Sequence, residues 1–370
     1  MKEIARFHEA SDRLSDTVAR IRRTGRKIIG YPCSYAPEEL IHAAGCHPLR
    51  LFASGHGIVQ AENHLQSYCC SVVRGILEDR LAGRLDFLDG AVFPHTCDSM
   101  QRLSDIWRMN GRHGFFADLA LPAKLNTPSS AAYMESVLAR CKSDLETALK
   151  ISITDDDLAA SIALFNQIRT HLSVIHDFYS RHPGQIRGSD MNALVKGAMI
   201  MDRNEAAALL ADVAASLRHM PVTDTPVKRV VLAGSVCDTP DLSDAIEAAG
   251  GAVVGDDLCT GQRWFDGRVD EVLPPLTALA DRYRERAICP AKHAGLTTRA
   301  DHLISLVNHT RAHGVLFVML KFCDPHAFDY PYLKKCLDEK GIKSMALEMD
   351  DGHQNQGQFS TRIETFIHML

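Results

Sequence analysis

The residues of this chain whose chemistry stands out are its 11 cysteines. An odd number of cysteines, in 370 residues that open without an apolar leader, argues against a framework of disulfides. Most of these side chains are expected to be small and buried. Thiolates also bind zinc and iron–sulfur clusters, so the question is whether a few cysteines occupy positions suited to a metal.

Three cysteines share a local pattern in which Cys-Asp follows an apolar run. The pairs are Cys97-Asp98, Cys237-Asp238 and Cys323-Asp324. If the apolar runs are parallel strands, these cysteines lie beyond the strands' carboxyl ends, where open α/β sheets bind their ligands. Each aspartate then suits the N-cap of the next helix. The pattern predicts thiols that face a crevice.

Two adjacent cysteines, Cys69 and Cys70, open an expected helix, where the helix dipole stabilises a thiolate. The chain has neither the compact cysteine spacing of ferredoxins nor a CxxC pair, so a metal site must be assembled from distant cysteines. Cys97 and Cys323 share such a site only if their strand-end crevices face each other. By spacing alone, a cluster and a zinc ion both remain open.

The segments that must position these cysteines alternate between helices and short apolar strands, which is typical of parallel α/β sheets. An N-terminal helix over residues 1–24 and a first α/β lobe are expected within residues 1–125. Residues 126–224 have long helical periodicity and predict a helical connector. Residues 225–370 return to strands and helices and predict a second lobe. The predicted fold class is therefore α/β, with two Rossmann- or flavodoxin-like lobes.

Composition narrows the classes of function. Apolar residues make up 46% and charged residues 24%, and the net charge of −5 offers no basic field for nucleic acid. The longest apolar runs, such as residues 314–320, are too short for a bilayer, and the charged residues 1–16 lack a signal peptide's apolar core. A cytoplasmic protein is expected. The chain contains no P-loop, GxGxxG or GxSxG motif, so it is not expected to hydrolyse ATP itself.

Several separate segments, in a fixed order, resemble the 2-hydroxyacyl-CoA dehydratase and benzoyl-CoA reductase family. They are GYPCSYAPEELIHAAGCHPLRLF, SYCCSVVRGILEDRLAGRLDFLDGAVFPHTCDSMQRLSDIW, GDDLCTGQRWF, LKFCDPHAFDYPYLKKCL and GQFSTRIETFIHML. The resemblance runs from about residue 28 to the C-terminus and is weakest in the helical middle.

The resemblance implies a [4Fe-4S] cluster that is held by three cysteines. The matching positions are Cys70 of CSVVRG, Cys97 of HTCD and Cys323 of KFCDP. Cys69 competes with Cys70 for its role, and Cys237 matches no ligand of the family, so we interpret it as a buried or crevice-lining thiol. One iron is then left without a protein ligand.

In dehydratases of this family, a low-potential electron reaches the thioester carbonyl of an (R)-2-hydroxyacyl-CoA, and water is eliminated through a ketyl radical. The resemblance thus implies an acyl-CoA thioester substrate, a homologous sister subunit and a separate ATP-hydrolysing iron–sulfur activator that supplies the electron. A neighbouring group must also move a proton. His95, Glu39 and His42 are the candidates, and His95 stands two residues before Cys97.

Three alternatives stay open beside the dehydratase. The first is a subunit of an ATP-dependent benzoyl-CoA (aromatic acyl-CoA) reductase. The second is a reductase relative with a larger, double-cubane cluster, for which the adjacent Cys69 and Cys70 supply an additional thiolate. The third is a non-catalytic electron-transfer subunit. The HTCD motif favours the dehydratase.

Overall fold

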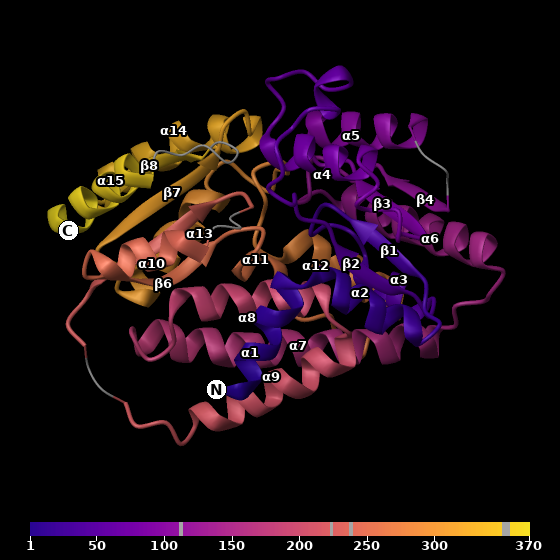
Figure 1. Cartoon of the computed structure of the whole chain (residues 1–370), viewed down its shortest axis with the longest axis horizontal. Helices are drawn as coiled ribbons and strands as arrows, with labels where there is room; N and C mark the ends of the chain where they lie inside the picture. Colours follow the sequence, from indigo (N-terminus) through magenta and orange to yellow (C-terminus); the bar gives the residue numbers. More distant parts are fainter. Residues whose placement is uncertain (111–113, 223–224, 237–239, 350–355) are drawn as a thin grey trace.

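The computed structural model describes residues 1–110, 114–222, 225–236, 240–349 and 356–370. Two α/β lobes stand side by side, and a layer of long helices runs beneath both of them (Figure 1). Within the described ranges, no helix combines the length and the apolar character that a membrane crossing requires.

The first lobe is built on an all-parallel sheet with the strand order β2-β1-β3-β4. Its strands are β1 (Ile28–Tyr31), β2 (His47–Arg50), β3 (Gly90–Pro94) and β4 (Phe115–Leu119). Its helical segments are α3 (Glu38–Ala43), the short 3-10 helix η1 (Ala61–Asn63), α4 (Ser71–Leu81) and α5 (Asp98–Met109). Every residue of β1, β2 and β3 is buried, because helices cover both faces of the sheet.

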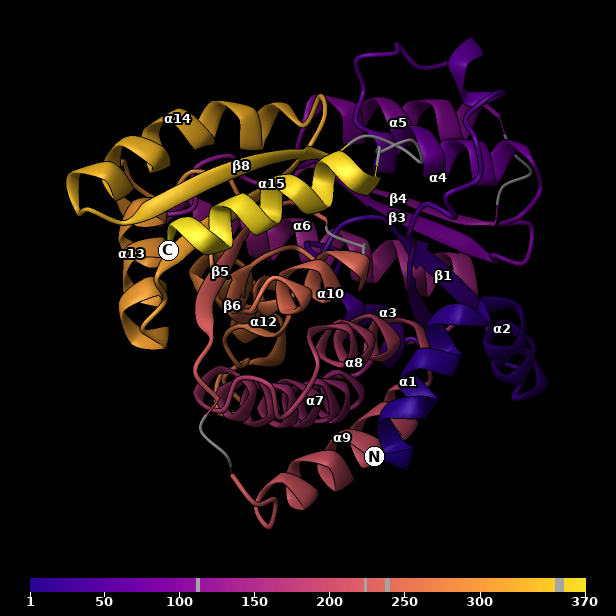
Figure 2. The same cartoon turned by 60° about the vertical axis from the view of Figure 1, so that its left-hand side comes forward.

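The second lobe repeats this plan with the strand order β6-β5-β7-β8. Its strands are β5 (Lys228–Gly234), β6 (Gly251–Asp257), β7 (Gly314–Leu320) and β8 (Lys343–Met349). Its helices are α10 (Pro240–Ala248), α11 (Gln262–Phe265), α13 (Thr298–Thr310), α14 (Asp324–Glu339) and α15 (Gln356–Met369). Helix α12 (Pro275–Glu285) lies in the same part of the sequence but packs into the core of the first lobe. Helices α14 and α15 lie on opposite sides of this sheet (Figure 2).

In both sheets the chain first adds a strand on one side and then crosses to the other side. This reversal places a switch point between β1 and β3, and another between β5 and β7. Open α/β sheets bind ligands beyond the carboxyl ends of their strands at such points. The topology therefore directs attention to the loops that follow these four strands.

The layer beneath the lobes consists of α7 (Asp155–Arg181), α8 (Gly188–Ile200) and α9 (Arg203–Leu217), whereas α6 (Pro128–Leu149) packs against β4 in the core of the first lobe. The long α7 begins with a capping box between Thr154 and Asp157, in which each residue bonds the other's backbone. It packs against α3 of the first lobe and β6 of the second, so one helix supports both lobes. These observations confirm the predicted fold class. The domain boundaries near residues 125 and 224 stay predictions.

The single helix predicted for residues 1–24 is wrong in one respect, because two helices are found, α1 (Lys2–Asp12) and α2 (Leu14–Arg23). Arg13 breaks the helix with φ −123° and ψ 60°. The apolar face of α1 packs into the core shared by the connector and the second lobe, whereas that of α2 packs into the core of the first lobe. One straight helix does not reach both cores.

Candidate functional site

A cavity of about 510 Å³ has walls from both lobes, and it contains the three cysteines singled out by their sequence. Cys70 and Cys97 come from the first lobe, and Cys323 comes from the second. Phe322 and Phe328 of the second lobe also line it. The strand-end crevices after β3 and β7 therefore open onto one space.

Each of these thiols belongs to the residue that caps a helix. Cys70 is the N-cap of α4, Cys97 of α5 and Cys323 of α14. The amino ends of three helices consequently point toward the cavity. A helix amino end carries partial positive charge, which favours an anionic group such as a thiolate-bound cluster.

The aspartates of the Cys-Asp pairs do not occupy the predicted N-cap position. Asp98 and Asp324 are instead the first helical residues of α5 and α14, where a carboxylate still interacts favourably with the dipole. The preceding cysteine has the non-helical backbone of the cap, for example φ −142° and ψ 169° at Cys97. The pair Cys237-Asp238 lies outside the described residues.

Cys69 and Cys70 differ in their relation to the cavity. Both are buried in the core of the first lobe, but only Cys70 also lines the cavity. This placement favours Cys70 as the ligand, in agreement with the motif CSVVRG.

The backbone before Cys323 is unusual. Phe322 has φ +63°, in the left-handed region that side chains with a Cβ rarely adopt. This residue forms the tight turn between the end of β7 and the cap of α14, and it thereby directs Cys323 to the cavity. Backbone strain of this kind is concentrated at functional sites.

Two of the cavity thiols favour the protonated form in the protein without metal. Burial raises the pKa of the Cys97 thiol to about 12 and that of Cys323 to about 12. Desolvation favours the protonated thiol, whereas the helix dipoles favour the thiolate, and here desolvation is the larger effect. Binding of a metal by these groups must release their protons.

A second set of three cysteines lies beside the first. The Sγ of Cys33 is 3.8 Å from Thr96 Oγ1, next to Cys97. The Cys289 thiol donates a hydrogen bond to Cys259, and Cys289 interacts electrostatically with both Cys97 and Cys323. We call Cys33, Cys259 and Cys289 the second thiol set.

The sequence interpretation missed the second thiol set, although part of the signal was present. Cys33 stands two residues after β1 and Cys259 two residues after β6, so both follow strand ends just as Cys97 and Cys323 do. Neither Cys33 nor Cys259 is followed by the aspartate that marks the other strand-end cysteines. Cys289 follows α12 and has no comparable local signal.

His95 lies at the edge of this region. Its Nε2 is 2.8 Å from Asp118 Oδ1 on β4, and the same carboxylate oxygen accepts a hydrogen bond from Ser104. Its backbone precedes Thr96, which lines the cavity. The His95 side chain is not among the lining residues, but its backbone adjoins one of them, and its role stays a prediction.

Glu39 and His42 lie elsewhere, between α3 and α7. Glu39 is fully buried and forms an ion pair with Arg169, whose charge holds the pKa of this carboxyl below its usual value although burial alone would raise it. Burial and the charge of Arg203 lower the pKa of His42, whose Nδ1 is 3.1 Å from Ser161 Oγ. Neither residue lines the cavity. The contacts of Glu39 and His42 hold α3 against α7. Their role in proton transfer stays a prediction.

Buried polar contacts connect the two lobes around the crevice. Trp264 Nε1 of α11 donates to Glu38 Oε2 of α3 at 2.5 Å, and the other oxygen of Glu38 is 3.0 Å from Arg203 Nη2 of α9. The hydroxyl of Tyr283 donates to the carbonyl of Ala36 at 2.6 Å. The lobes are therefore held together by specific bonds as well as by apolar packing.

Asp257, two residues before Cys259, is held by two arginines. Asp257 is 1% exposed and forms ion pairs with Arg263 at 2.6 Å and with Arg299 at 3.0 Å. The charges of both arginines keep the pKa of this carboxyl well below its usual range, against the effect of burial. Arg263 also donates from Nη1 to the Sγ of Cys259 at 3.4 Å.

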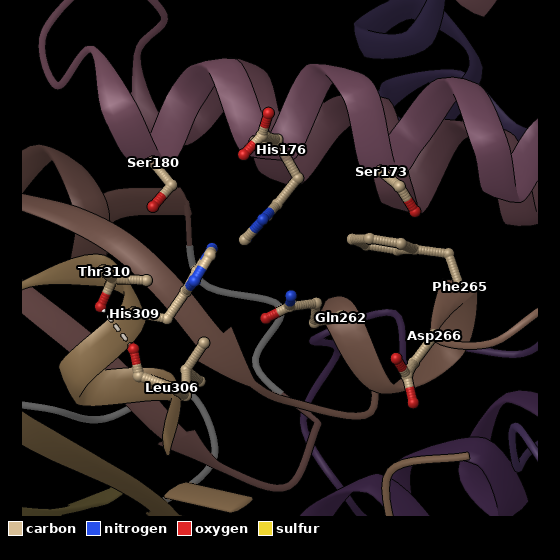
Figure 3. A pocket seen from close by; sticks show the side chains of 10 residues that line it. Ser173, His176, Ser180, Gln262, Phe265, Asp266, Leu306, His309 and Thr310 are labelled. Atoms are coloured by element: carbon tan, nitrogen blue, oxygen red, sulfur yellow. Dashed lines mark hydrogen bonds between the residues drawn. The ribbon is translucent and has the colours of Figure 1, made fainter. Parts of the chain in front are cut away.

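A smaller cavity of about 110 Å³ lies between α7, α11 and α13. His176, Gln262 and His309 extend into it from these three helices (Figure 3). Burial lowers the pKa of His176 to about 4, and its Nε2 is 3.7 Å from Asp256 Oδ2. None of the residues that line this cavity is a cysteine. It is a separate space from the thiol-lined one.

The donor chemistry fits a cluster better than a single ion. In the described part of the chain, no group of three or more His, Cys, Asp and Glu side chains is arranged to hold one metal ion. A cubane cluster separates its thiolate ligands by its own width, so it needs thiols distributed around a cavity. Cys70, Cys97 and Cys323 have that arrangement.

Comparison with known proteins gives a consistent result. The family model for the 2-hydroxyglutaryl-CoA dehydratase D-component matches residues 33–370. The chain is 28% identical to the (R)-phenyllactyl-CoA dehydratase beta subunit of Clostridium sporogenes, over 95% of this chain and 93% of that protein. It is 29% identical to the lactoyl-CoA dehydratase subunit beta of Anaerotignum propionicum, over 94% of this chain and 92% of that protein. It is also 28% identical to a benzoyl-CoA reductase subunit of Thauera aromatica, over 91% of this chain and 90% of that protein.

Proposed function

Because this chain belongs to the 2-hydroxyglutaryl-CoA dehydratase D-component family, we propose that it is the iron–sulfur subunit of a 2-hydroxyacyl-CoA dehydratase. One observation carries the proposal, namely that thiols from both lobes, Cys70, Cys97 and Cys323, line one cavity. Relatives named as beta subunits of dehydratases support a homologous sister subunit as partner.

Each part of the site has a proposed task. Cys70, Cys97 and Cys323 hold a [4Fe-4S] cluster, and the amino ends of α4, α5 and α14 favour its negative charge. When bound, the cluster supplies one-electron transfer and an iron that acts as a Lewis acid toward an acyl-CoA thioester. Phe322 and Phe328 border the cavity with exposed rings that offer an apolar surface to a substrate. His95, oriented by Asp118, moves the proton.

The electron comes from outside this chain in the proposed reaction. The sequence has no nucleotide-binding loop, which supports a separate ATP-hydrolysing iron–sulfur activator as the donor. The exposed side of the cavity provides a route by which the activator's electron enters the site. The overall reaction removes water from an (R)-2-hydroxyacyl-CoA and returns the electron.

The content of iron and acid-labile sulfide per chain, after anaerobic purification, tests the cofactor. We expect about four of each for one [4Fe-4S] cluster. A protein that lacks both, even after anaerobic reconstitution, contradicts the proposal. The purified complex is then assayed with a 2-hydroxyacyl-CoA and with benzoyl-CoA, each in the presence of activator, ATP and a reductant.

The assay also separates the branches of the family. Dehydration of the hydroxyacyl-CoA supports the dehydratase, whereas ring reduction identifies an aromatic acyl-CoA reductase, for which the similar protein is the benzoyl-CoA reductase subunit of Thauera aromatica. A chain that carries the cluster and turns over neither substrate, although its sister subunit does, is an electron-transfer subunit.

A specific observation favours a second candidate, a reductase relative with a double-cubane cluster. The second thiol set, Cys33, Cys259 and Cys289, adjoins the cavity cysteines and supplies as many thiols again. These residues, rather than Cys69, are the structural source of further thiolates. About eight irons per chain, and turnover of a small substrate without a sister subunit, would support this candidate.

A further inference from the structure

Arg50, the last residue of β2, is a buried cation for which the described residues provide no counter-ion. It is 3% exposed, and its Nε and Nη1 have no hydrogen-bond partner in the described part of the chain. Its guanidinium lies 5.7 Å from the centre of the Tyr31 ring and 5.9 Å from that of Phe52. A charge removed from water in this way is costly unless an anion accompanies it.

The other deeply buried arginines of the described chain have partners, which makes Arg50 an exception. Their contacts are Arg169 with Glu39, Arg203 with Glu38, Arg263 with Asp257, Arg282 with the carbonyls of Trp264, Asp266 and Gly267, and Arg286 with the carbonyls of Ser34 and Arg263. The fold thus satisfies buried guanidinium groups where they have only a structural role.

Arg50 also stands at a position that matters for the site. It pairs with Tyr31 in the register of β1 and β2, at the carboxyl end of the first sheet, and Cys33 follows two residues after Tyr31. The positive charge of Arg50 helps to lower the pKa of the Cys259 thiol in the second lobe. Arg263 donates to the same thiol from the second lobe. Two cations from opposite lobes therefore act on one thiol of the second thiol set, although Arg50 is not among the residues that line the cavity of Cys70, Cys97 and Cys323.

We propose that Arg50 is the counter-charge of an iron–sulfur cluster held in the crevice between the lobes, and that it makes the cluster easier to reduce. This inference rests on the proposed function. A thiolate-bound cluster is anionic, and each added electron makes it more negative. A fixed cation in a region of low dielectric therefore stabilises the reduced state more than the oxidised state. Binding of the cluster also gives the guanidinium the anion that it lacks.

The test compares Arg50→Met and Arg50→Lys with the unchanged protein. Met fills a similar volume without charge, and Lys retains the charge. Arg140→Met on α6 is the matched control, because its side chain is 84% exposed and its loss removes the same charge from the surface. The readouts are the iron content, the midpoint potential from a redox titration followed by electron paramagnetic resonance, and the unfolding of the metal-free protein.

We expect Arg50→Met to shift the midpoint potential to a more negative value, Arg50→Lys to restore most of the shift, and Arg140→Met to leave it unchanged. The metal-free Arg50→Met protein should be as stable as the parent or more stable, because the substitution removes an uncompensated buried charge. A structural arginine gives the opposite result, since its loss destabilises the metal-free protein.

The outcomes separate the inference from the proposed function. Loss of iron in Arg50→Met, with an intact metal-free fold and recovery in Arg50→Lys, also supports the counter-charge. A full iron content with an unchanged potential overturns the inference and leaves the proposed function in place. A parent protein that binds no iron overturns both.

Discussion

Cys97 and Cys323 are 226 residues apart in the chain, belong to different lobes, and line the same cavity as N-caps of α5 and α14. Because the two cysteines come from different lobes, a cluster that both of them bind requires the lobes to pack against each other. The site also contains equivalent contributions from two similar sheets.

Replacement of either residue should remove the cluster without unfolding the chain. In Cys97→Ala or Cys323→Ala, we expect the iron content to fall to less than about a tenth of the parent value, because the remaining two thiols cannot hold a cubane. Iron analysis and far-ultraviolet circular dichroism measure the two effects.

Cys141→Ala and Cys336→Ala are the controls, since Cys141 is buried in α6 and Cys336 lies on α14 away from the cavity lining. Both should keep their iron. If Cys97→Ala keeps a full complement, the proposed ligand set is wrong.

The metal-free thiols should differ in reactivity with pH. A hydrogen bond from Cys289 and the charge of Arg263 lower the pKa of the Cys259 thiol to about 7, although burial opposes them, whereas Cys97 and Cys323 have values of about 12. Only a thiolate is alkylated quickly. Iodoacetamide labelling, located by mass spectrometry, should therefore modify Cys259 first, with a rate that rises through pH 7. Faster labelling of Cys97 would contradict this order.

Phe322 should tolerate glycine better than a β-branched residue. Its φ of +63° suits glycine and is strained for valine, at a cost of about 1–3 kcal/mol. We expect Phe322→Gly to keep the iron content and Phe322→Val to reduce it, because the turn then no longer directs Cys323 to the cavity. Equal iron in both variants would show that this backbone conformation does not control the site.

Glu39 provides a test between a catalytic and a structural role. Glu39→Ala leaves the buried Arg169 unpaired and should reduce the free energy of unfolding by about 3–5 kcal/mol. Asp144→Ala breaks an exposed pair with Arg140 and should cost less than about 1 kcal/mol. Urea denaturation gives both values. A Glu39→Ala protein with unchanged stability and lost activity would restore Glu39 as a proton carrier.

His47 should make stability depend on pH. Burial and the charge of Arg203 lower the pKa of His47 to about 3 from its usual 6.5. Below pH 6.5 the unfolded chain takes up a proton that the folded protein does not bind until about pH 3. The contribution of His47 is thus complete above pH 6.5 and is lost as the pH falls toward 3, by at most about 1.4 kcal/mol per pH unit. In His47→Gln, the urea midpoint should fall less steeply over this range.

The secondary-structure plan and the family can be recognised from the amino-acid sequence without the structure. Helix and strand periodicities are local, so the alternation of elements and the long helical middle could be predicted from neighbouring residues. The same local patterns located Cys70, Cys97 and Cys323, because a residue between a strand and a helix can be recognised from its flanking segments. The break at Arg13 could not be predicted, since it depends on two cores that α1 and α2 contact separately.

The tertiary structure alone decided which side chains meet. It placed Cys70, but not Cys69, on the cavity, and it separated Glu39 and His42 from the cavity thiols. It also gathered the second thiol set and left Arg50 without an anion among the described residues. These relationships join residues from different sheets, and their distances are set by how α7 and the buried contacts between the lobes hold the two sheets together. Periodicity along one segment contains no information about that packing.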